Sequence, residues 1–217
     1  MTTRVELETP SGTAWADIDV PDADPKGVLY IGHGAGGGVE APDVRAARDG
    51  ALAADLIVAR ITQPYRVAGR RTPVPAPRLD EAWLAVTGEL NDQLGKLPTV
   101  HCGRSSGARV ACRTAAVTGA VAVIALAFPL HLPGRPERSR LDELELPTVP
   151  VLVIQGEKDT FGMPPPGPKR QIVVIPGDTH SLKKDLRIVR DSVTEFLAKQ
   201  LAPKPRRAKK TQKTQKS

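Results

Sequence analysis

The sequence is poor in aromatic residues and cysteine and has no long apolar run. Phe, Trp and Tyr make up only 3% of the 217 residues, although 40% of all residues are apolar, so alanine and valine must fill much of the core. The two cysteines, Cys102 and Cys112, fit neither a metal-ligand spacing nor a disulfide framework, which favours a reducing, cytoplasmic setting. No run reaches the roughly 18 to 20 apolar residues of a membrane helix, and the first residues contain no apolar segment of a signal peptide. We therefore expect a cytoplasmic protein without a membrane segment.

Positive charge is concentrated at the end of the chain. Residues 203–217 hold seven of the 31 basic residues and no acidic residue. The 24 basic residues that remain balance the 24 acidic ones, so the net charge of +7 belongs to this tail. We expect one domain over 1–202 and a basic, disordered tail over 203–217. The tail is either a solubilising end or a weak, salt-sensitive binding site for an anionic partner.

Short apolar runs alternate with longer amphipathic segments along the rest of the chain. Two segments with period-two alternation, 4–8 and 13–20, predict an antiparallel hairpin at one edge of a sheet. Strands buried on both faces are expected at 27–32, 56–61 and 120–128, and further strands are expected at 98–103, 149–156 and 170–177. Amphipathic helices are expected at 41–55, 78–94, 106–119 and 181–201. This alternation predicts an α/β fold with a mostly parallel central sheet flanked by helices.

The stretch GRSSG, residues 103–107, lies between a predicted strand and a predicted helix. It matches the pattern G-x-S-x-G, in which a serine lies on a sharp turn and the glycines avoid collisions with neighbouring elements. The middle serine, Ser105, is the candidate nucleophile. The backbone N–H of Ser106 is a candidate donor to an oxyanion. The alternative is that one of the two serines simply caps the helix.

A serine nucleophile needs a base. His180 lies in the loop between the last predicted strand and the last predicted helix, where its ring can reach Ser105 over the end of the sheet. His101 lies inside a predicted strand and is expected in the core. The alternative for His180 is an ordinary histidine of a surface loop.

The base in turn needs an acid that orients it. Asp159 follows the end of a predicted strand and is the expected acid, whereas Glu157 and Asp178 are the alternatives. The three candidates then occur in the order Ser105, Asp159, His180, which is nucleophile, acid and base.

The glycine-rich stretch HGAGGG, residues 33–38, follows the predicted strand 27–32. Glycine lets the backbone approach a tetrahedral intermediate closely, so the N–H of Ala35 is the second expected oxyanion donor. The stretch lacks the Lys-Ser/Thr of a phosphate-binding loop and fits no dinucleotide pattern with an acidic partner. We expect neither a cofactor nor a metal.

Several residues that follow predicted strands are expected to line a substrate pocket. The predicted loop 63–77 is rich in Pro and Arg and is expected to overhang the site. Free basic residues there would favour an anionic acyl substrate, whereas basic residues that are solvated or paired with acids of the body would have no such effect. The candidate pocket residues are His33, Tyr65, Arg66, Arg70, Arg104 and His131.

Four stretches, HGAGGG, GRSSG, QGEKD and GDTHS, together resemble the α/β-hydrolase superfamily over residues 27–201. The short segment 128–148 leaves no room for a lid domain, as in the small, lidless, dienelactone-hydrolase-like group. The stretches QPYRVAGRR and FPLHLPGRPE resemble more particularly a branch that includes a subunit of the NSL histone-acetyltransferase complex. Dienelactone hydrolases proper use a cysteine nucleophile, and Ser105 departs from that pattern, which argues against lactone substrates.

The resemblance implies acyl transfer to Ser105, with His180 as the base, Asp159 as its orienting acid, and the N–H groups of Ala35 and Ser106 as the oxyanion hole. The expected activity is hydrolysis of small, soluble esters or thioesters through an acyl-enzyme. Peptidase and acyltransferase activities are variants that the sequence does not separate. The alternative is a non-catalytic hydrolase-fold scaffold or binding protein that uses its basic tail, because scaffold roles exist in the same branch.

Overall fold

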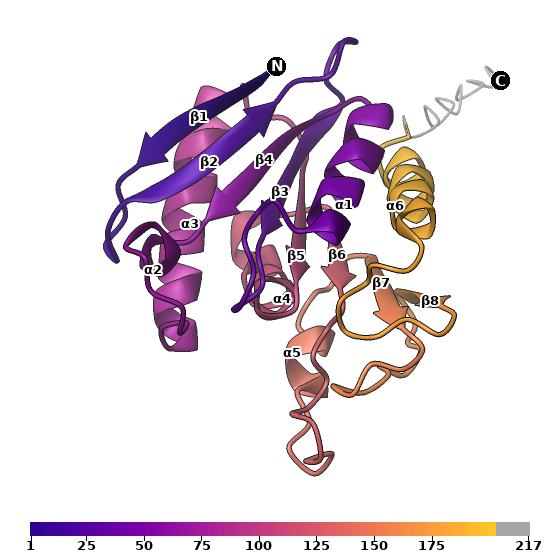
Figure 1. Cartoon of the computed structure of the whole chain (residues 1–217). Helices are drawn as coiled ribbons and strands as arrows, with labels where there is room; N and C mark the ends of the chain where they lie inside the picture. The colour runs from indigo at the N-terminus through magenta and orange to yellow at the C-terminus, as the bar shows by residue number, and fades with distance from the viewer. Residues whose placement is uncertain (203–217) are drawn as a thin grey trace, which may run out of the picture.

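Eight strands form the frame of the protein. In this computed structural model they span Thr2–Leu7 (β1), Ala14–Asp19 (β2), Gly27–Gly32 (β3), Leu56–Thr62 (β4), Thr99–Arg104 (β5), Ala122–Leu126 (β6), Val151–Gly156 (β7) and Arg170–Ile175 (β8). They form one sheet in the order β1-β2-β4-β3-β5-β6-β7-β8 (Figure 1). The structure describes residues 1–202, so the predicted tail, 203–217, lies outside the described residues.

The sheet is parallel from β4 through β3 to β8, whereas β2 pairs with both β1 and β4 in the antiparallel sense. The predicted hairpin at one edge is therefore confirmed, as is the α/β fold with a mostly parallel sheet. Because the carboxyl ends of parallel strands meet at one edge, the residues that follow β3, β5 and β7 are brought together there.

Helices cover both faces of the sheet (Figure 1). α1 packs beside α6 on one face, and α3 packs beside α4 on the other. Neighbouring residues of β3 alternate between the two cores: Leu29 and Ile31 belong to the first, and Val28 and Tyr30 to the second. The helices span Pro42–Ala53 (α1), Pro64–Val67 (α2), Ala76–Gln93 (α3), Ser106–Thr118 (α4), Leu141–Glu145 (α5) and Leu186–Gln200 (α6).

Several element boundaries differ from the sequence prediction, and three of these differences have a local cause. The predicted loop 63–77 contains α2 and the start of α3, because proline in a first helical turn begins a helix and does not prevent it. β6 ends at Leu126, since Ala127 adopts a φ of 46°. The last helix begins at Leu186, where the Asp185 side chain caps the helix by accepting a hydrogen bond from the N–H of Arg187.

His101 is fully buried in the core, as its place in a strand predicts. The indole N–H of Trp83 donates a hydrogen bond of 3.3 Å to its Nδ1, and its Nε2 lies 3.2 Å from Thr118 Oγ1. Burial lowers the pKa of His101 to about 3, so its ring is neutral. Cys102 and Cys112 are also buried, and both are free thiols.

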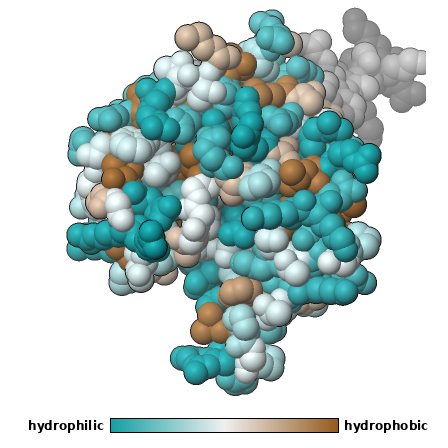
Figure 2. All heavy atoms as spheres, viewed as in Figure 1, coloured by the Kyte–Doolittle hydropathy of each residue, from teal (hydrophilic) through white to brown (hydrophobic). Residues whose placement is uncertain are grey.

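The face of the described residues that Figure 2 shows is mostly polar, with scattered apolar side chains. Within residues 1–202, no helix is both long and apolar enough to cross a membrane. The same part of the chain contains no group of three or more His, Cys, Asp or Glu placed to hold a metal ion.

Candidate active site

Ser105 lies on a strained turn between β5 and α4. Its backbone has a φ of 52° and a ψ of −110°, which is unusual for a residue with a side chain. The flanking glycines make this turn possible: a Cβ at Gly103 would collide with the backbone of Gly107, and a Cβ at Gly107 would lie 2.6 Å from the carbonyl oxygen of Gly32. Ser105 occupies the N-cap position of α4, but its side chain makes no capping hydrogen bond. The hydroxyl is therefore available for other contacts.

A chain of hydrogen bonds joins Ser105 to two residues far along the sequence. Ser105 Oγ lies 2.8 Å from His180 Nε2, and His180 Nδ1 lies 2.9 Å from Asp159 Oδ2. The side chain of Asp159 is 1% exposed and that of His180 is 19% exposed. With Asp159 ionised, Nδ1 carries the proton of the ring, which leaves the Nε2 lone pair to accept the hydrogen of the hydroxyl.

Both carboxylate oxygens of Asp159 accept hydrogen bonds that hold the side chain in place. Gln155 Nε2 donates a hydrogen bond of 2.8 Å to Oδ2, and the backbone N–H of Phe161 donates one of 2.8 Å to Oδ1. The Phe161 ring also stacks on the imidazole of His180, with ring centroids 4.1 Å apart. Neither residue was identified from the sequence, although Gln155 is the one polar residue in the buried strand β7.

The two alternative acids make other contacts. Glu157 accepts a hydrogen bond of 2.6 Å from the N–H of Gly177. Asp178 accepts hydrogen bonds from the N–H groups of Thr179 and Lys184, at 2.8 and 2.9 Å. Among the described residues, the carboxylate bonded to the His180 ring is that of Asp159.

Arg104 is engaged by the protein itself. Its Nε donates a hydrogen bond of 3.0 Å to Asp43 Oδ2, and its Nη2 donates one of 3.0 Å to the backbone carbonyl oxygen of His180. Burial raises the pKa of the Asp43 carboxyl, and the neighbouring guanidinium opposes that rise. Arg104 was predicted to line a pocket, but its charge is directed at Asp43 and at the loop of His180.

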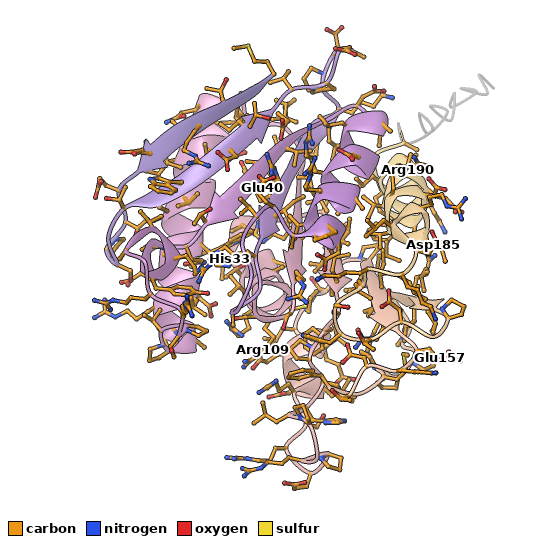
Figure 3. The ribbon with its side chains drawn as sticks, in the orientation of Figure 1. His33, Glu40, Arg109, Glu157, Asp185 and Arg190 are labelled. Carbon is orange, nitrogen blue, oxygen red and sulfur yellow. The ribbon has the colours of Figure 1, made fainter. Side chains whose placement is uncertain are left out.

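His33 holds the glycine-rich loop in place. Its side chain is buried beside the loop that precedes α1 (Figure 3), its Nδ1 donates a hydrogen bond of 2.9 Å to the carbonyl of Gly34, and its Nε2 accepts one of 3.1 Å from the N–H of Gln63. Burial lowers the pKa of His33, in keeping with a neutral ring. Both ring nitrogens are thus used by the protein. Tyr65 Oη lies 3.5 Å from the carbonyl oxygen of Ala35, on the same loop.

The remaining candidates lie at the start of α4, in and after α2, and in the segment that follows β6. Ser106 is the first residue of α4, so its N–H has no acceptor inside the helix. Arg66 belongs to α2, and Arg70 follows it. The backbone N–H of His131 donates a hydrogen bond of 3.0 Å to the carbonyl of Phe161, which places His131 next to the residue that stacks on His180.

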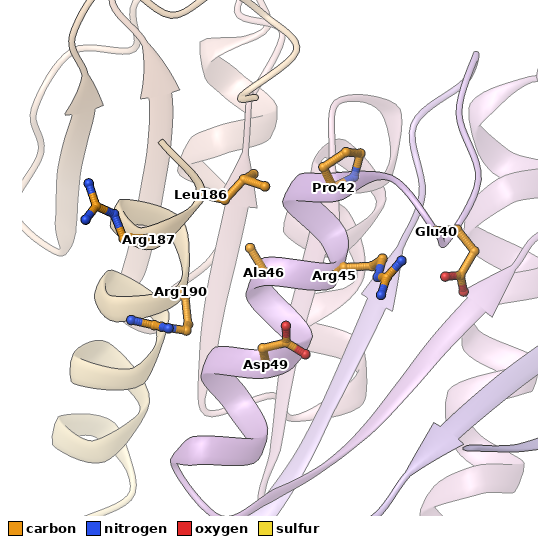
Figure 4. A pocket seen from close by; sticks show the side chains of 8 residues that line it. All are labelled: Glu40, Pro42, Arg45, Ala46, Asp49, Leu186, Arg187 and Arg190. Atoms are coloured by element: carbon orange, nitrogen blue, oxygen red, sulfur yellow. The ribbon is translucent and has the colours of Figure 1, made fainter. Parts of the chain in front are cut away.

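A cavity of about 390 Å³ lies away from this site, between α1 and α6 (Figure 4). In the figure, Arg187 and Arg190 point away from Arg45 across the cavity, so the three guanidinium groups do not converge on one point. The cavity is lined by Glu40, Pro42, Arg45, Ala46, Asp49, Leu186, Arg187 and Arg190.

The fold and the sequence define the class of the protein. A family model described as alpha/beta hydrolase domain matches residues 25–190, and the chain belongs to this family. The resemblance to the α/β-hydrolase superfamily is therefore confirmed, whereas the branch with the NSL-complex subunit remains a prediction. No curated protein matches the sequence.

Three solved structures illustrate the likeness in fold. A lidless α/β serine hydrolase from Xanthomonas campestris has a TM-score of 0.78 and 20% identity, with 94% of this chain and 97% of that chain covered. Est1E from Butyrivibrio proteoclasticus has a TM-score of 0.76 and 20% identity, with 92% and 99% covered. A dienelactone hydrolase from Anabaena variabilis has a TM-score of 0.69 and 17% identity, with 92% and 95% covered.

Proposed function

We propose that the protein is a serine carboxylic-ester hydrolase that cleaves small, soluble esters or thioesters through an acyl-enzyme on Ser105. The observation that carries the proposal is the hydrogen-bonded chain from Ser105 through His180 to Asp159. The strained backbone at Ser105 supports it, because strain at a residue that no packing contact explains is typical of functional sites. The names of the structurally similar hydrolases agree with this class of reaction.

In the first half of the reaction, His180 Nε2 takes the proton of the Ser105 hydroxyl while Oγ attacks the carbonyl carbon of the substrate. The carbonyl oxygen becomes an oxyanion, which the N–H groups of Ala35 and Ser106 bind. The N-terminus of α4 adds its positive dipole end at the same place. His180 then gives the proton to the leaving alcohol or thiol, the tetrahedral intermediate collapses, and an ester on Ser105 remains.

In the second half, a water molecule replaces the leaving group. His180 takes a proton from the water, the oxygen attacks the acyl carbon, and the proton returns to Ser105 as the carboxylic acid leaves. Asp159 keeps the ring in the Nδ1–H tautomer and stabilises the imidazolium that forms in each half. Gln155 acts through Asp159 as a positioning residue, because its amide holds the carboxylate oxygen that faces His180.

The proposal also covers the setting of the enzyme. We infer that residues 1–202 form one domain, and the single sheet that runs through them and the family match inside them support this. A cytoplasmic location agrees with two cysteines that are buried and unbridged.

A fluorophosphonate probe tests the nucleophile directly, because it modifies serines that an adjacent base activates. We expect the unmodified protein to be labelled and Ser105→Ala to lose the label. Hydrolysis of 4-nitrophenyl esters of increasing acyl length should disappear in the same variant. Labelling that persists in Ser105→Ala contradicts the proposal. Absence of labelling in both proteins would favour the alternative of a non-catalytic scaffold.

A further inference from the structure

Positive charge without an ion-pair partner is concentrated in two loops. The first, here called the α2 loop, comprises residues 63–75 and contains Arg66, Arg70 and Arg71. The second, the β6–α5 loop, comprises residues 127–140 and contains Arg135 and Arg138. In the part of the chain that the structure describes, none of these five guanidinium groups has a carboxylate oxygen within 4.0 Å.

Arginines elsewhere in the described residues are nearly all paired. Arg113 binds Asp80 and Glu143, each at 2.7 Å, and Arg109 also binds Glu143. Outside the two loops, Arg45 is the one described arginine without such a partner. The sequence left open whether basic residues near the site are free, solvated or paired with acids of the body. The five arginines of the two loops have no carboxylate partner among the described residues, whereas Arg104 is paired with Asp43.

Both loops are attached to the candidate active site. On one side, Tyr65 of the α2 loop lies 3.5 Å from the carbonyl oxygen of Ala35, and the N–H of Arg70 donates to the carbonyl of Tyr65. On the other side, His131 of the β6–α5 loop donates to Phe161, whose ring stacks on His180. One residue of each loop therefore contacts the oxyanion loop or the residue that stacks on His180, which places both loops next to the candidate site.

The local charge is not cancelled within the loops. Residues 63–75 contain three arginines and no acid, and residues 127–140 contain three arginines and one acid, Glu137. Since basic and acidic residues balance over 1–202 as a whole, the compensating negative charge lies elsewhere on the body. Charge of one sign around a site raises the local concentration of oppositely charged substrates.

We propose that the substrate is an ester or thioester that carries negative charge beside the scissile bond, and that the arginines of the two loops bind this charge. This inference rests on the proposed hydrolase activity. Carboxylate and phosphate groups share the chemistry that guanidinium recognises, because either can accept two parallel hydrogen bonds from one arginine. Arg104 is not part of this set, since its guanidinium is bound by Asp43 and His180.

Three substrates separate the effect of substrate charge from the hydrolysis reaction itself. 4-Nitrophenyl acetate is neutral, mono-4-nitrophenyl glutarate carries a carboxylate on its acyl side, and acetyl-coenzyme A carries phosphates on its leaving group. We expect kcat/KM to be higher for at least one anionic probe than for the neutral one. We expect this preference to weaken as NaCl is raised from about 0.05 to about 0.5 M, because salt screens exposed charges.

Variants that remove the arginine charges then identify which of the two loops binds the negative charge of the substrate. The triple variant Arg66→Gln/Arg70→Gln/Arg71→Gln and the double variant Arg135→Gln/Arg138→Gln each remove one group of charges. In at least one of them, the ratio of kcat/KM for the anionic probe to that for the neutral probe should fall about tenfold. A loop whose variant lowers the ratio for the glutarate ester faces the acyl group. A loop whose variant lowers the ratio for acetyl-coenzyme A faces the leaving group.

A matched control removes three charges from the opposite edge of the sheet. Lys26, Lys96 and Lys169 precede β3, β5 and β8, at the amino ends of these parallel strands. The variant Lys26→Gln/Lys96→Gln/Lys169→Gln should leave the ratio unchanged. An equal fall in the control and in the loop variants, or no fall in either loop variant, overturns the inference.

Failure of the inference is distinguishable from failure of the proposed function. If 4-nitrophenyl acetate is hydrolysed in a Ser105-dependent way without any charge preference, the inference alone fails. If no probe is hydrolysed, calorimetry measures whether coenzyme A and glutarate bind to the Ser105→Ala protein. This measurement decides whether an anion site is present. Binding that a loop variant weakens about tenfold supports an anion site, whereas no binding, or binding that neither loop variant weakens, overturns it.

Discussion

Arg104 donates a hydrogen bond of 3.0 Å to the backbone carbonyl oxygen of His180. The same guanidinium binds Asp43, whose side chain is 1% exposed, at the start of α1. One side chain next to Ser105 thereby joins the end of β5 to α1 and to the loop that contains His180. The position of His180 over Ser105 depends on this buried ion pair as well as on Asp159.

We expect Arg104→Met to lower kcat more than it raises KM, because the loop of His180 loses its support while the substrate contacts remain. Arg104→Lys should recover only part of the loss, since one ammonium cannot reproduce the fork that binds Asp43 and the carbonyl together. A change in the pH dependence of kcat/KM should accompany the loss, because the ring of His180 is held less firmly. Steady-state kinetics from pH 5 to 9 measures all three effects.

Stability provides the control for this prediction. Removing the arginine alone leaves Asp43 buried without its cation, which costs about 3–5 kcal/mol of unfolding free energy. Arg104→Met/Asp43→Asn removes both charges and should regain much of that stability without regaining kcat. Recovery of kcat in the double variant would mean that Arg104 acts on folding alone.

The two serines of the turn should respond differently to substitution. Ser105→Ala removes the attacking oxygen and should lower kcat by several orders of magnitude. Ser106→Ala keeps the backbone N–H, which is the group proposed to bind the oxyanion, and should remain close to the unmodified protein. Hydrolysis of 4-nitrophenyl acetate measures both. Equal losses in the two variants would contradict the assignment of the nucleophile.

Asp159→Asn should lower kcat by about 10⁴, because an amide no longer selects the Nδ1–H tautomer of His180. Glu157→Gln is the matched control: it changes a carboxylate in the same loop, but that carboxylate binds the N–H of Gly177 and not His180. We expect Glu157→Gln to retain most of the activity. If the control loses as much activity as Asp159→Asn, the orienting acid has been misassigned.

The buried His101 should make stability depend on pH. Its pKa is about 3 in the folded protein, against 6.5 for an ordinary histidine. Between these values the unfolded chain binds a proton that the folded protein does not, so the free energy of unfolding falls as the pH is lowered below 6.5. The slope is at most about 1.4 kcal/mol per pH unit from this group.

His101→Gln removes that titration and should flatten the dependence by a similar amount, while His33, whose pKa is also lowered, continues to contribute in the same direction. Urea unfolding at several pH values between 4.5 and 7 measures the slope. Identical slopes for the two proteins would mean that His101 is not protonated on unfolding in this range.

Much of the fold could be predicted because buried parallel strands have a simple signature. Runs such as 27–32 and 122–126 are apolar on both faces, as expected for a strand between two helical layers. The prediction was wrong where proline was taken as a sign of loop: Pro64 begins α2. Proline also fits the first turn of a helix, and only the surrounding packing distinguishes a loop from the start of a helix.

The candidate site was predictable where its residues follow strands. Ser105, Asp159 and His180 each come after a strand whose carboxyl end lies at the same edge, so topology alone brings them near one another. The contacts that hold them were not predictable. Asp43 binds Arg104, which is 61 residues further along the chain. Gln155 is only four residues from Asp159, but the sequence does not show that its amide faces that carboxylate.

The sequence by itself determined the strand–helix alternation, the glycine-flanked turn at Ser105 and the order of the three candidate residues, because periodicity and steric demands at single positions are local. Only the tertiary structure decided which arginine side chains bind a carboxylate of the protein and which have no such partner among the described residues. Arg104 is held by Asp43, whereas Arg66 has no described carboxylate partner. An arginine looks the same in the sequence in either case, since its pairing depends on which carboxylate the fold brings within reach.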